Sequence, residues 1–176
     1  MKNALLFAVL VVTPAFAQHH GSTDSPYAGQ QDRAIKALSD EETKQYLAGA
    51  GMGYAKAAEM NGYPGPMHVL ELADQLGLSA DQRAAVRKLM EVHKAEARAI
   101  GAKYVQSERD IEMLFRHGDV DRQKLASLVD QAAKLQGEYR LSHLETHRRA
   151  LALLTPEQVA AYGELRGYGQ KHHRKG

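Results

Sequence analysis

Two long amphipathic segments on either side of a short glycine turn constrain the fold of this chain most. Residues 78–117 and 122–154 both repeat apolar side chains at helical spacing. Between them, Gly118 is suited to end one helix, and Asp119 or Asp121 is suited to cap the next. Helices joined by so few residues pair antiparallel. The pattern therefore predicts an all-α fold built on a long antiparallel helical hairpin with short flanking helices.

The apolar positions of each segment form one stripe along the predicted helix. In the first segment the stripe consists of Val86, Leu89, Met90, His93, Ala97, Ile100, Tyr104, Ile111, Leu114 and Phe115. In the second it consists of Leu125, Leu128, Val129, Ala132, Leu135, Tyr139, His143, Ala150, Leu153 and Leu154. Two paired helices alone are too thin to bury all of this apolar surface. The short helices or a second chain must cover that surface, and we expect a homodimer.

The residues before the hairpin carry their own helix signals. Ser39 followed by Glu42 is a capping box that predicts one helix over residues 38–60. Glycine and proline over residues 61–66 predict a break, and residues 67–77 predict a short helix. A final short helix is expected after the hairpin.

Both ends of the chain differ from this helical region. Residues 1–17 combine a positive start, an apolar run too short to span a bilayer and a small-residue cleavage site after Ala17. This layout predicts a secretory signal peptide and export to a bacterial periplasm. Residues 18–37 are predicted to be a flexible polar leader, and residues 171–176 a basic tail. Residues 38–170 then form a single helical domain.

Composition excludes several kinds of site. The chain has no cysteine, so disulfides, thiolate metal sites and a thiol nucleophile are ruled out. A formal net charge of +2 gives no reason to expect nucleic acid as a partner. We find no Ser/His/Asp set and no carboxylate pair arranged for acid–base chemistry. The sequence therefore predicts a binding protein with no required cofactor rather than an enzyme.

Two short motifs flank the hairpin, LSADQ at residues 78–82 and LTPEQ at residues 154–158. On these motifs the chain resembles the LTxxQ periplasmic stress proteins of the Spy/CpxP family, and more distantly the ZraP and CnrX-type heavy-metal resistance proteins. The resemblance covers residues 66–168. The motif positions are expected to act as structural caps: Leu78, Ser79, Gln82, Leu154, Thr155 and Gln158.

The resemblance implies two kinds of function. The first is ATP-independent, chaperone-like binding of unfolded or misfolded periplasmic proteins on the face of a helical dimer. The second is heavy-metal binding or sensing. Besides unfolded proteins and a second copy of the chain, we also consider the periplasmic domain of a membrane sensor as a partner.

The stretch HLETH at residues 143–147 contains two histidines one helical turn apart. In zinc proteases of the H-E-x-x-H type, the glutamate adjoins the first histidine so that it can act on the metal-bound water. Here Glu145 lies two residues from each histidine and is expected on the far side of the helix. The protease interpretation fails, but His143 and His147 could still meet one ion.

The predicted hairpin brings a third histidine to this pair. His93 and His143 each lie 25 residues from Gly118, and Met90 and His147 lie 28 and 29 residues from it. The sequence thus predicts a cross-hairpin metal site of His93, His143 and His147, with Met90 as a further ligand. Three imidazoles suit a Zn, Cu or Ni ion. The alternative is that these histidines are hydrogen-bonded core residues or solvated surface residues.

Two further groups could bind metal. If cleavage follows Ala17, His20 becomes the third residue and could complete a square-planar Cu(II) or Ni(II) site with the free amine. Met52, Met60 and Met67 bracket the Gly/Pro break, and their thioethers could bind Cu(I). The alternatives are a disordered tail for His20 and flexible packing for the methionines.

Overall fold

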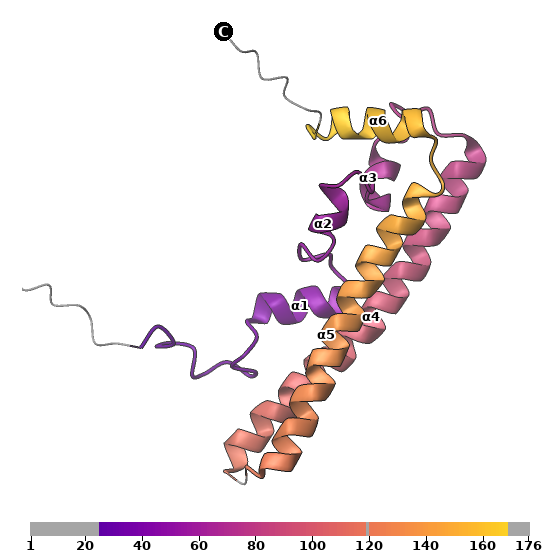
Figure 1. Ribbon diagram of the computed structural model, residues 1–176. Helices are drawn as coiled ribbons and strands as arrows, with labels where there is room; N and C mark the ends of the chain where they lie inside the picture. Colours follow the sequence, from indigo (N-terminus) through magenta and orange to yellow (C-terminus); the bar gives the residue numbers. More distant parts are fainter. Residues whose placement is uncertain (1–24, 119, 169–176) are drawn as a thin grey trace, which may run out of the picture. The chain divides into compact units, whose positions relative to one another are not determined.

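The computed structural model describes residues 25–118 and 120–168, and these residues are helices and turns without a strand (Figure 1). The chain divides into two compact units, residues 1–31 and 32–176, and all described helices belong to the second. The predicted signal peptide, His20 and the basic tail lie outside the described residues. No helix in the described ranges is both long and apolar enough to cross a membrane. The predicted all-α class is confirmed.

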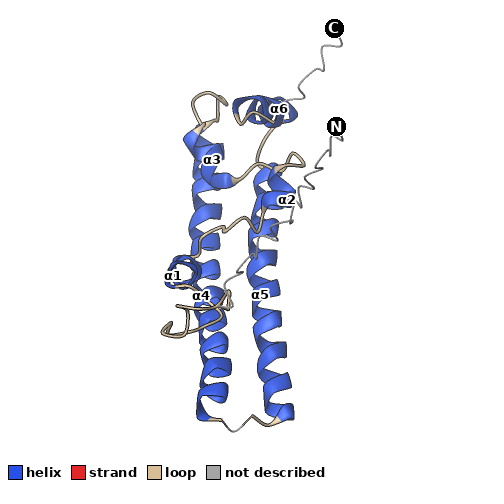
Figure 2. Ribbon diagram, turned by 90° about the vertical axis from the view of Figure 1, so that its left-hand side faces the viewer, coloured by secondary structure: helices blue, strands red, loops and turns tan. Residues whose placement is uncertain are grey.

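The hairpin consists of α4 (Ala80–His117) and α5 (Arg122–Leu151), which lie side by side along their length (Figure 2). Gly118 ends α4 in the left-handed conformation, with φ 75°. The Asp121 side chain caps α5 by accepting a hydrogen bond from the backbone N–H of Lys124 at 2.8 Å. The predicted hairpin is therefore confirmed. Its second helix ends three residues earlier than predicted, at Leu151, and residues 152–154 turn the chain into the next cap.

The segment before the hairpin differs from the prediction. A single helix over residues 38–60 is wrong: the structure has α1 (Asp40–Ala48) and α2 (Lys56–Glu59). The physical reason is Gly49, whose left-handed φ of 68° ends α1 while its N–H donates to the Tyr46 carbonyl. The predicted short helix over residues 67–77 is α3 (Pro66–Glu71), followed by turns.

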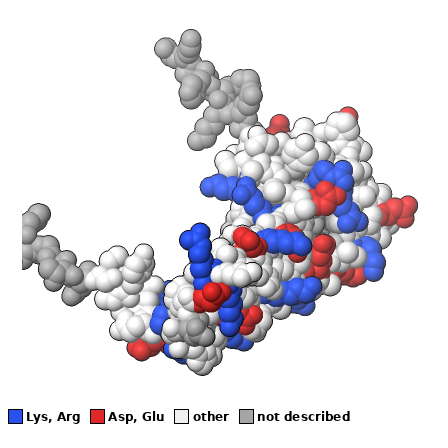
Figure 3. Space-filling view, turned by 60° about the horizontal axis from the view of Figure 1, so that its bottom comes forward, with Lys and Arg blue, Asp and Glu red and all other residues white. Residues whose placement is uncertain are grey.

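The short helices cover different parts of the hairpin. The helix α1 packs across α4, α2 contacts α5, and α3 packs between α4 and α5. The last helix, α6 (Pro156–Leu165), lies across the end of the hairpin opposite the Gly118 turn (Figures 1 and 2). On the face drawn in Figure 3, basic and acidic side chains are interspersed, as the small net charge suggests.

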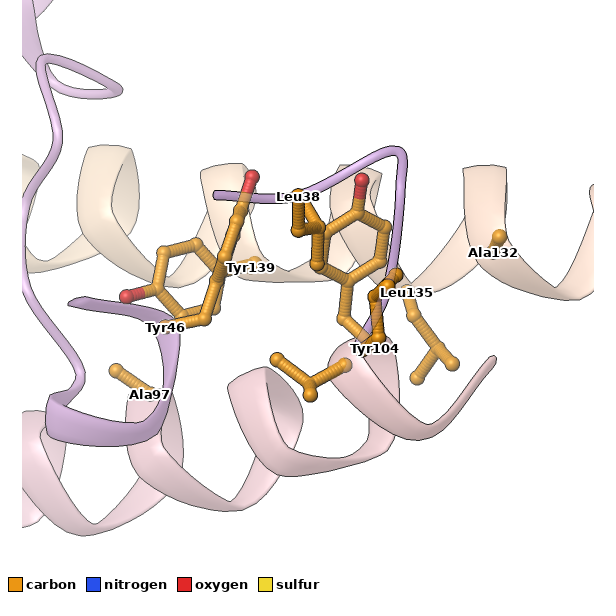
Figure 4. Close-up of a cluster of buried hydrophobic side chains, with 9 residues drawn as sticks. Leu38, Tyr46, Ala97, Tyr104, Ala132, Leu135 and Tyr139 are labelled. Carbon is orange, nitrogen blue, oxygen red and sulfur yellow. The ribbon is translucent and has the colours of Figure 1, made fainter. Parts of the chain in front are cut away.

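Two cores line the hairpin. The first lies where α1 crosses it, and Tyr46 packs there against Tyr104 and Tyr139 with ring centroids 4.6 and 5.0 Å apart (Figure 4). Ile35, which the sequence analysis assigns to the polar leader, is only 3% exposed and belongs to this core. The second core joins α3, α6 and the start of α4. It consists of Val69, Ala73, Leu76, Leu78, Val86 and Tyr162.

The two motifs meet at this second core. Ser79 and Thr155 each form a complete capping box, with Gln82 and Gln158 as the third helical residues. The two glutamine amides also bond each other reciprocally, at 2.8 and 3.1 Å. Gln82 donates in addition to the Leu153 carbonyl and Gln158 to the Leu76 carbonyl. The motifs thus cap two helices and tie their beginnings together.

Some predicted core positions are wrong. Phe115 and Val129 are 57% and 47% exposed, whereas Leu114, the neighbour of Phe115, is buried. Successive helical residues point about 100° apart, so one residue of such a pair faces inward and the other outward. Conversely, Ser107, Ser142 and Thr146 are buried although they are polar. Each hydroxyl donates to a carbonyl of its own helix three or four residues earlier, so its burial leaves no unpaired group.

Replacing either of two glycines in the long helices by alanine should have opposite effects on stability. A Cβ at Gly101 would lie 2.1 Å from the carbonyl oxygen of Tyr46, so Gly101→Ala must push α1 off α4. We expect it to destabilise the fold by about 2 kcal/mol or more. A Cβ at Gly137 meets no described atom within 4 Å. Gly137→Ala is therefore the matched control, expected to stabilise α5 by about 0.5–1 kcal/mol. Urea denaturation of both variants checks this, and equal effects would contradict the close approach.

Candidate functional site

A cavity of about 720 Å³ opens between the hairpin and the segment that contains α2 and α3. Four of the five histidines and four of the five methionines in the described residues line it. We call the thioether group the cavity methionines: Met52, Met60, Met67 and Met90. The histidines are His68, His93, His143 and His147. These two residue types supply nitrogen and sulfur donors, so this cavity is the candidate binding site.

The centre of the site is the histidine pair, His93 of α4 and His143 of α5. The Nε2 of His93 and the Nδ1 of His143 are 3.0 Å apart, and the two rings meet nearly at right angles. Both side chains are buried, at 7% and 5% exposure. The pairing of these residues across the hairpin, which their equal distance from Gly118 predicts, is present in the structure.

The pair leaves two nitrogens without hydrogen bonds. Among the described residues, the Nδ1 of His93 and the Nε2 of His143 are buried and unpaired. Each neutral imidazole has one N–H and one lone pair. Whichever ring donates the shared proton, one of the unpaired nitrogens is an N–H and the other carries a free lone pair. An unpaired buried polar group costs about 1–3 kcal/mol, so the pair is poised to accept a further ligand.

Burial also keeps both rings neutral. It lowers the pKa of His143 to about 4, with a smaller contribution from the neighbouring histidines His93 and His147. Burial is likewise the main cause that lowers the pKa of His93. At neutral pH both imidazoles therefore carry lone pairs, the form in which histidine binds metals.

The third predicted histidine takes a different partner. His147 lines the cavity, but its Nδ1 donates to the backbone carbonyl of Tyr63 at 2.9 Å and lies 3.5 Å from the Glu59 carboxylate. Because a carbonyl only accepts, the proton of the neutral ring is on Nδ1, and Nε2 then carries the lone pair. A ligand histidine held by a backbone carbonyl has this same arrangement.

Glu59 links the elements that form one wall of the cavity, and no motif or periodicity in the sequence predicts this role. Its carboxylate accepts a hydrogen bond from the Tyr162 hydroxyl and lies 3.6 Å from the Arg166 guanidinium. Gly65 packs so closely here that a Cβ would lie 2.9 Å from Glu59. This cluster joins α2, α5 and α6 around His147.

The donor set fits a metal ion in part. Within residues 25–118 and 120–168, no three His, Asp or Glu side chains are already arranged around one ion. The histidine pair does fit, because two nitrogens on one ion are about 3–4 Å apart when each bond is about 2 Å. Met90 lines the same cavity, as expected, and Glu145 points away and pairs with Arg148. The geometry thus leaves two imidazoles within reach of one ion, and other donors would have to complete a site.

The buried pair predicts a pH dependence. An unfolded histidine has a pKa of about 6.5, so the unfolded chain binds more protons than the folded chain between pH 6.5 and 4. The free energy of unfolding should therefore fall by up to about 3 kcal/mol as pH is lowered through this range. His143→Gln should flatten the profile, whereas His117→Gln, at an exposed position, should not. Urea denaturation from pH 7.5 to 4 tests this, and parallel profiles for wild type and His143→Gln would contradict it.

Comparison with known proteins adds the family. The family model described as heavy-metal resistance matches residues 46–161, which is 116 of the 176 residues and includes the hairpin, the histidine pair and the cavity methionines. No curated protein and no solved structure gives a significant match. The match covers well over half of the chain, and the chain belongs to the heavy-metal resistance family.

Proposed function

We propose that this protein binds a transition-metal ion in the cavity and that the histidine pair provides two of its ligands. The observation that carries the proposal is the 3.0 Å separation of two neutral, buried imidazole nitrogens whose outer nitrogens are unpaired. An ion between the two facing nitrogens would displace the proton that the rings share, and the unpaired outer nitrogen of the donating ring would take it up, so that both imidazoles stay neutral. The proposal agrees with a family described by heavy-metal resistance.

The surrounding residues favour binding over chemistry. His147 offers a third imidazole with its lone pair free, and Zn, Cu and Ni all accept such a set. The Glu59 carboxylate is engaged by Tyr162 and Arg166. The proposed role is therefore metal capture or sensing in the bacterial periplasm, the compartment that residues 1–17 predict.

Metal titration tests the role of the pair. His143→Gln removes one of the two imidazole donors and should weaken Zn(II), Ni(II) or Cu(II) binding by about 10–100-fold. His117→Gln is the matched control, since His117 is exposed at the end of α4 and should leave affinity unchanged. Competition with a chromophoric chelator gives the affinities. Histidines at both chain ends are common to all variants, so their contribution cancels.

His147→Gln separates two forms of the site. If His147 is a third ligand, His147→Gln should weaken metal affinity about as much as His143→Gln. If only His93 and His143 bind the ion, the loss of affinity should be smaller. Equal affinity in wild type, His93→Gln and His143→Gln would remove the pair from consideration.

A Spy/CpxP-like chaperone function is the second candidate, and exposed apolar side chains favour it. Leu141 and Phe115, on the two long helices, are 62% and 57% exposed. Such side chains could hold unfolded clients or contact the second copy of an expected homodimer.

Client aggregation tests the second candidate. The protein should suppress light scattering of an aggregating client at stoichiometric ratio. Leu141→Gln and Phe115→Gln should weaken suppression about two-fold or more, whereas Leu47→Gln, an exposed leucine on α1, should not. Sedimentation of the same samples reports the oligomeric state. Undiminished scattering at a stoichiometric ratio would count against a chaperone.

A further inference from the structure

We propose that the ion bound in the cavity is the soft monovalent ion Cu(I) and that the cavity methionines are its sulfur donors. This inference rests on the proposed function, which leaves the metal open among Zn, Cu and Ni. It adds a ligand type, an entry route and a selectivity.

Of the cavity methionines, Met52 packs against the first core, and core packing does not explain the other three. No methionine in the described residues is fully buried: Met60 and Met67 are 61% and 51% exposed, and the other cavity methionines are partly buried. Methionine usually serves to fill gaps in a core. Here four of these flexible side chains line one opening, while Met113, the remaining described methionine, lies elsewhere on α4.

The donors that line the cavity differ in exposure. Met60 and Met67 are the most exposed, Met52 and Met90 are partly buried, and the pair itself is almost inaccessible. Met90 also precedes His93 by three residues on α4, so both lie on one face of that helix. The order describes a route in which exposed thioethers capture the ion and inner donors hold it.

Met52 is held in an unfavourable backbone conformation. Its φ is 47°, and no other non-glycine residue in the described ranges has a positive φ. Glycine occupies this region freely and stands on both sides of Met52, yet the position itself carries a thioether. Strained residues of this kind cluster at ligand clamps, which supports a role for the Met52 side chain in binding.

Donor chemistry selects the ion. Soft thioethers favour Cu(I), whereas Zn(II) and Ni(II) gain little from them, and imidazole suits all three. Because the chain has no cysteine, the thioethers are its only sulfur donors. A site of two imidazoles and several thioethers therefore prefers the monovalent ion. No redox step is required, since the ion arrives and leaves as Cu(I).

The test compares a soft with a borderline ion on the same variants of the full chain. Cu(I) affinity is measured by competition with a Cu(I) chelator without oxygen, Ag(I) serves as a redox-inert probe, and Zn(II) is the reference. Met52→Leu and Met90→Leu conserve volume, and each should weaken Cu(I) and Ag(I) binding about tenfold or more. Zn(II) affinity should stay within about two-fold, and Met113→Leu should change none of the three.

The exposed methionines keep the test valid if an inner variant misfolds. Met60→Leu and Met67→Leu alter largely exposed side chains, so the fold should survive, and the double variant should bind Ag(I) several-fold more weakly. X-ray absorption at the copper edge should show sulfur neighbours in the wild type and fewer of them in Met52→Leu/Met90→Leu.

Each result separates the inference from the proposed function. Cu(I) affinity that depends on His143 but on none of the cavity methionines would overturn the inference and leave the proposed function intact. Equal losses for Cu(I) and Zn(II) in the methionine variants would overturn the selectivity. Binding of no ion that depends on the histidine pair would overturn the proposed function and this inference with it.

Discussion

The antiparallel pairing of α4 with α5 is the constraint on which the other contacts depend. Side chains on a helix turn by about 100° per residue, so a shift of one position in either helix would turn His93 away from His143. The same register brings Tyr104 of α4 and Tyr139 of α5 to Tyr46, which packs against both in the first core. The link between the helices is only a few residues long, and it leaves them little freedom to slide. Site and core are therefore specified together.

The segment between α1 and α4 packs over the hairpin and forms the cavity together with it. Left-handed turns at Gly49 and Gly53 fold the chain back over α4 and α5 instead of letting it continue as a helix. Glu59 then fixes the segment to α5 and α6 through its contacts with His147, Arg166 and Tyr162. Without this irregular stretch the histidine pair would lie on an open helical face. With it, the pair forms the floor of a cavity.

The sequence predicts the regular parts of this structure better than the irregular ones. Long stripes at helical spacing identify α4 and α5, and distance from Gly118 is enough to bring His93 opposite His143. The break after α1 could not be predicted because Gly49 can occupy a helix or a left-handed turn, and the close approach of α4, where a Cβ at Gly49 would lie 3.1 Å from the backbone nitrogen of Arg98, is visible only in the folded chain. The partner of His147 is Tyr63, 84 residues away in a segment without periodicity. Ile35 is similar: a single apolar residue in a polar stretch carries no pattern.

The reciprocal bond between Gln82 and Gln158 has a consequence for how the fold forms. These amides are 76 residues apart and close a loop that contains the whole hairpin. In a chain without cysteine, this bond links two distant positions without a covalent cross-link. Unlike a disulfide, the pair constrains only the folded chain, and it links two helix starts that are each already capped by their own box. Through this bond the two motifs stabilise each other, and we expect the starts of α4 and α6 to fold and unfold together.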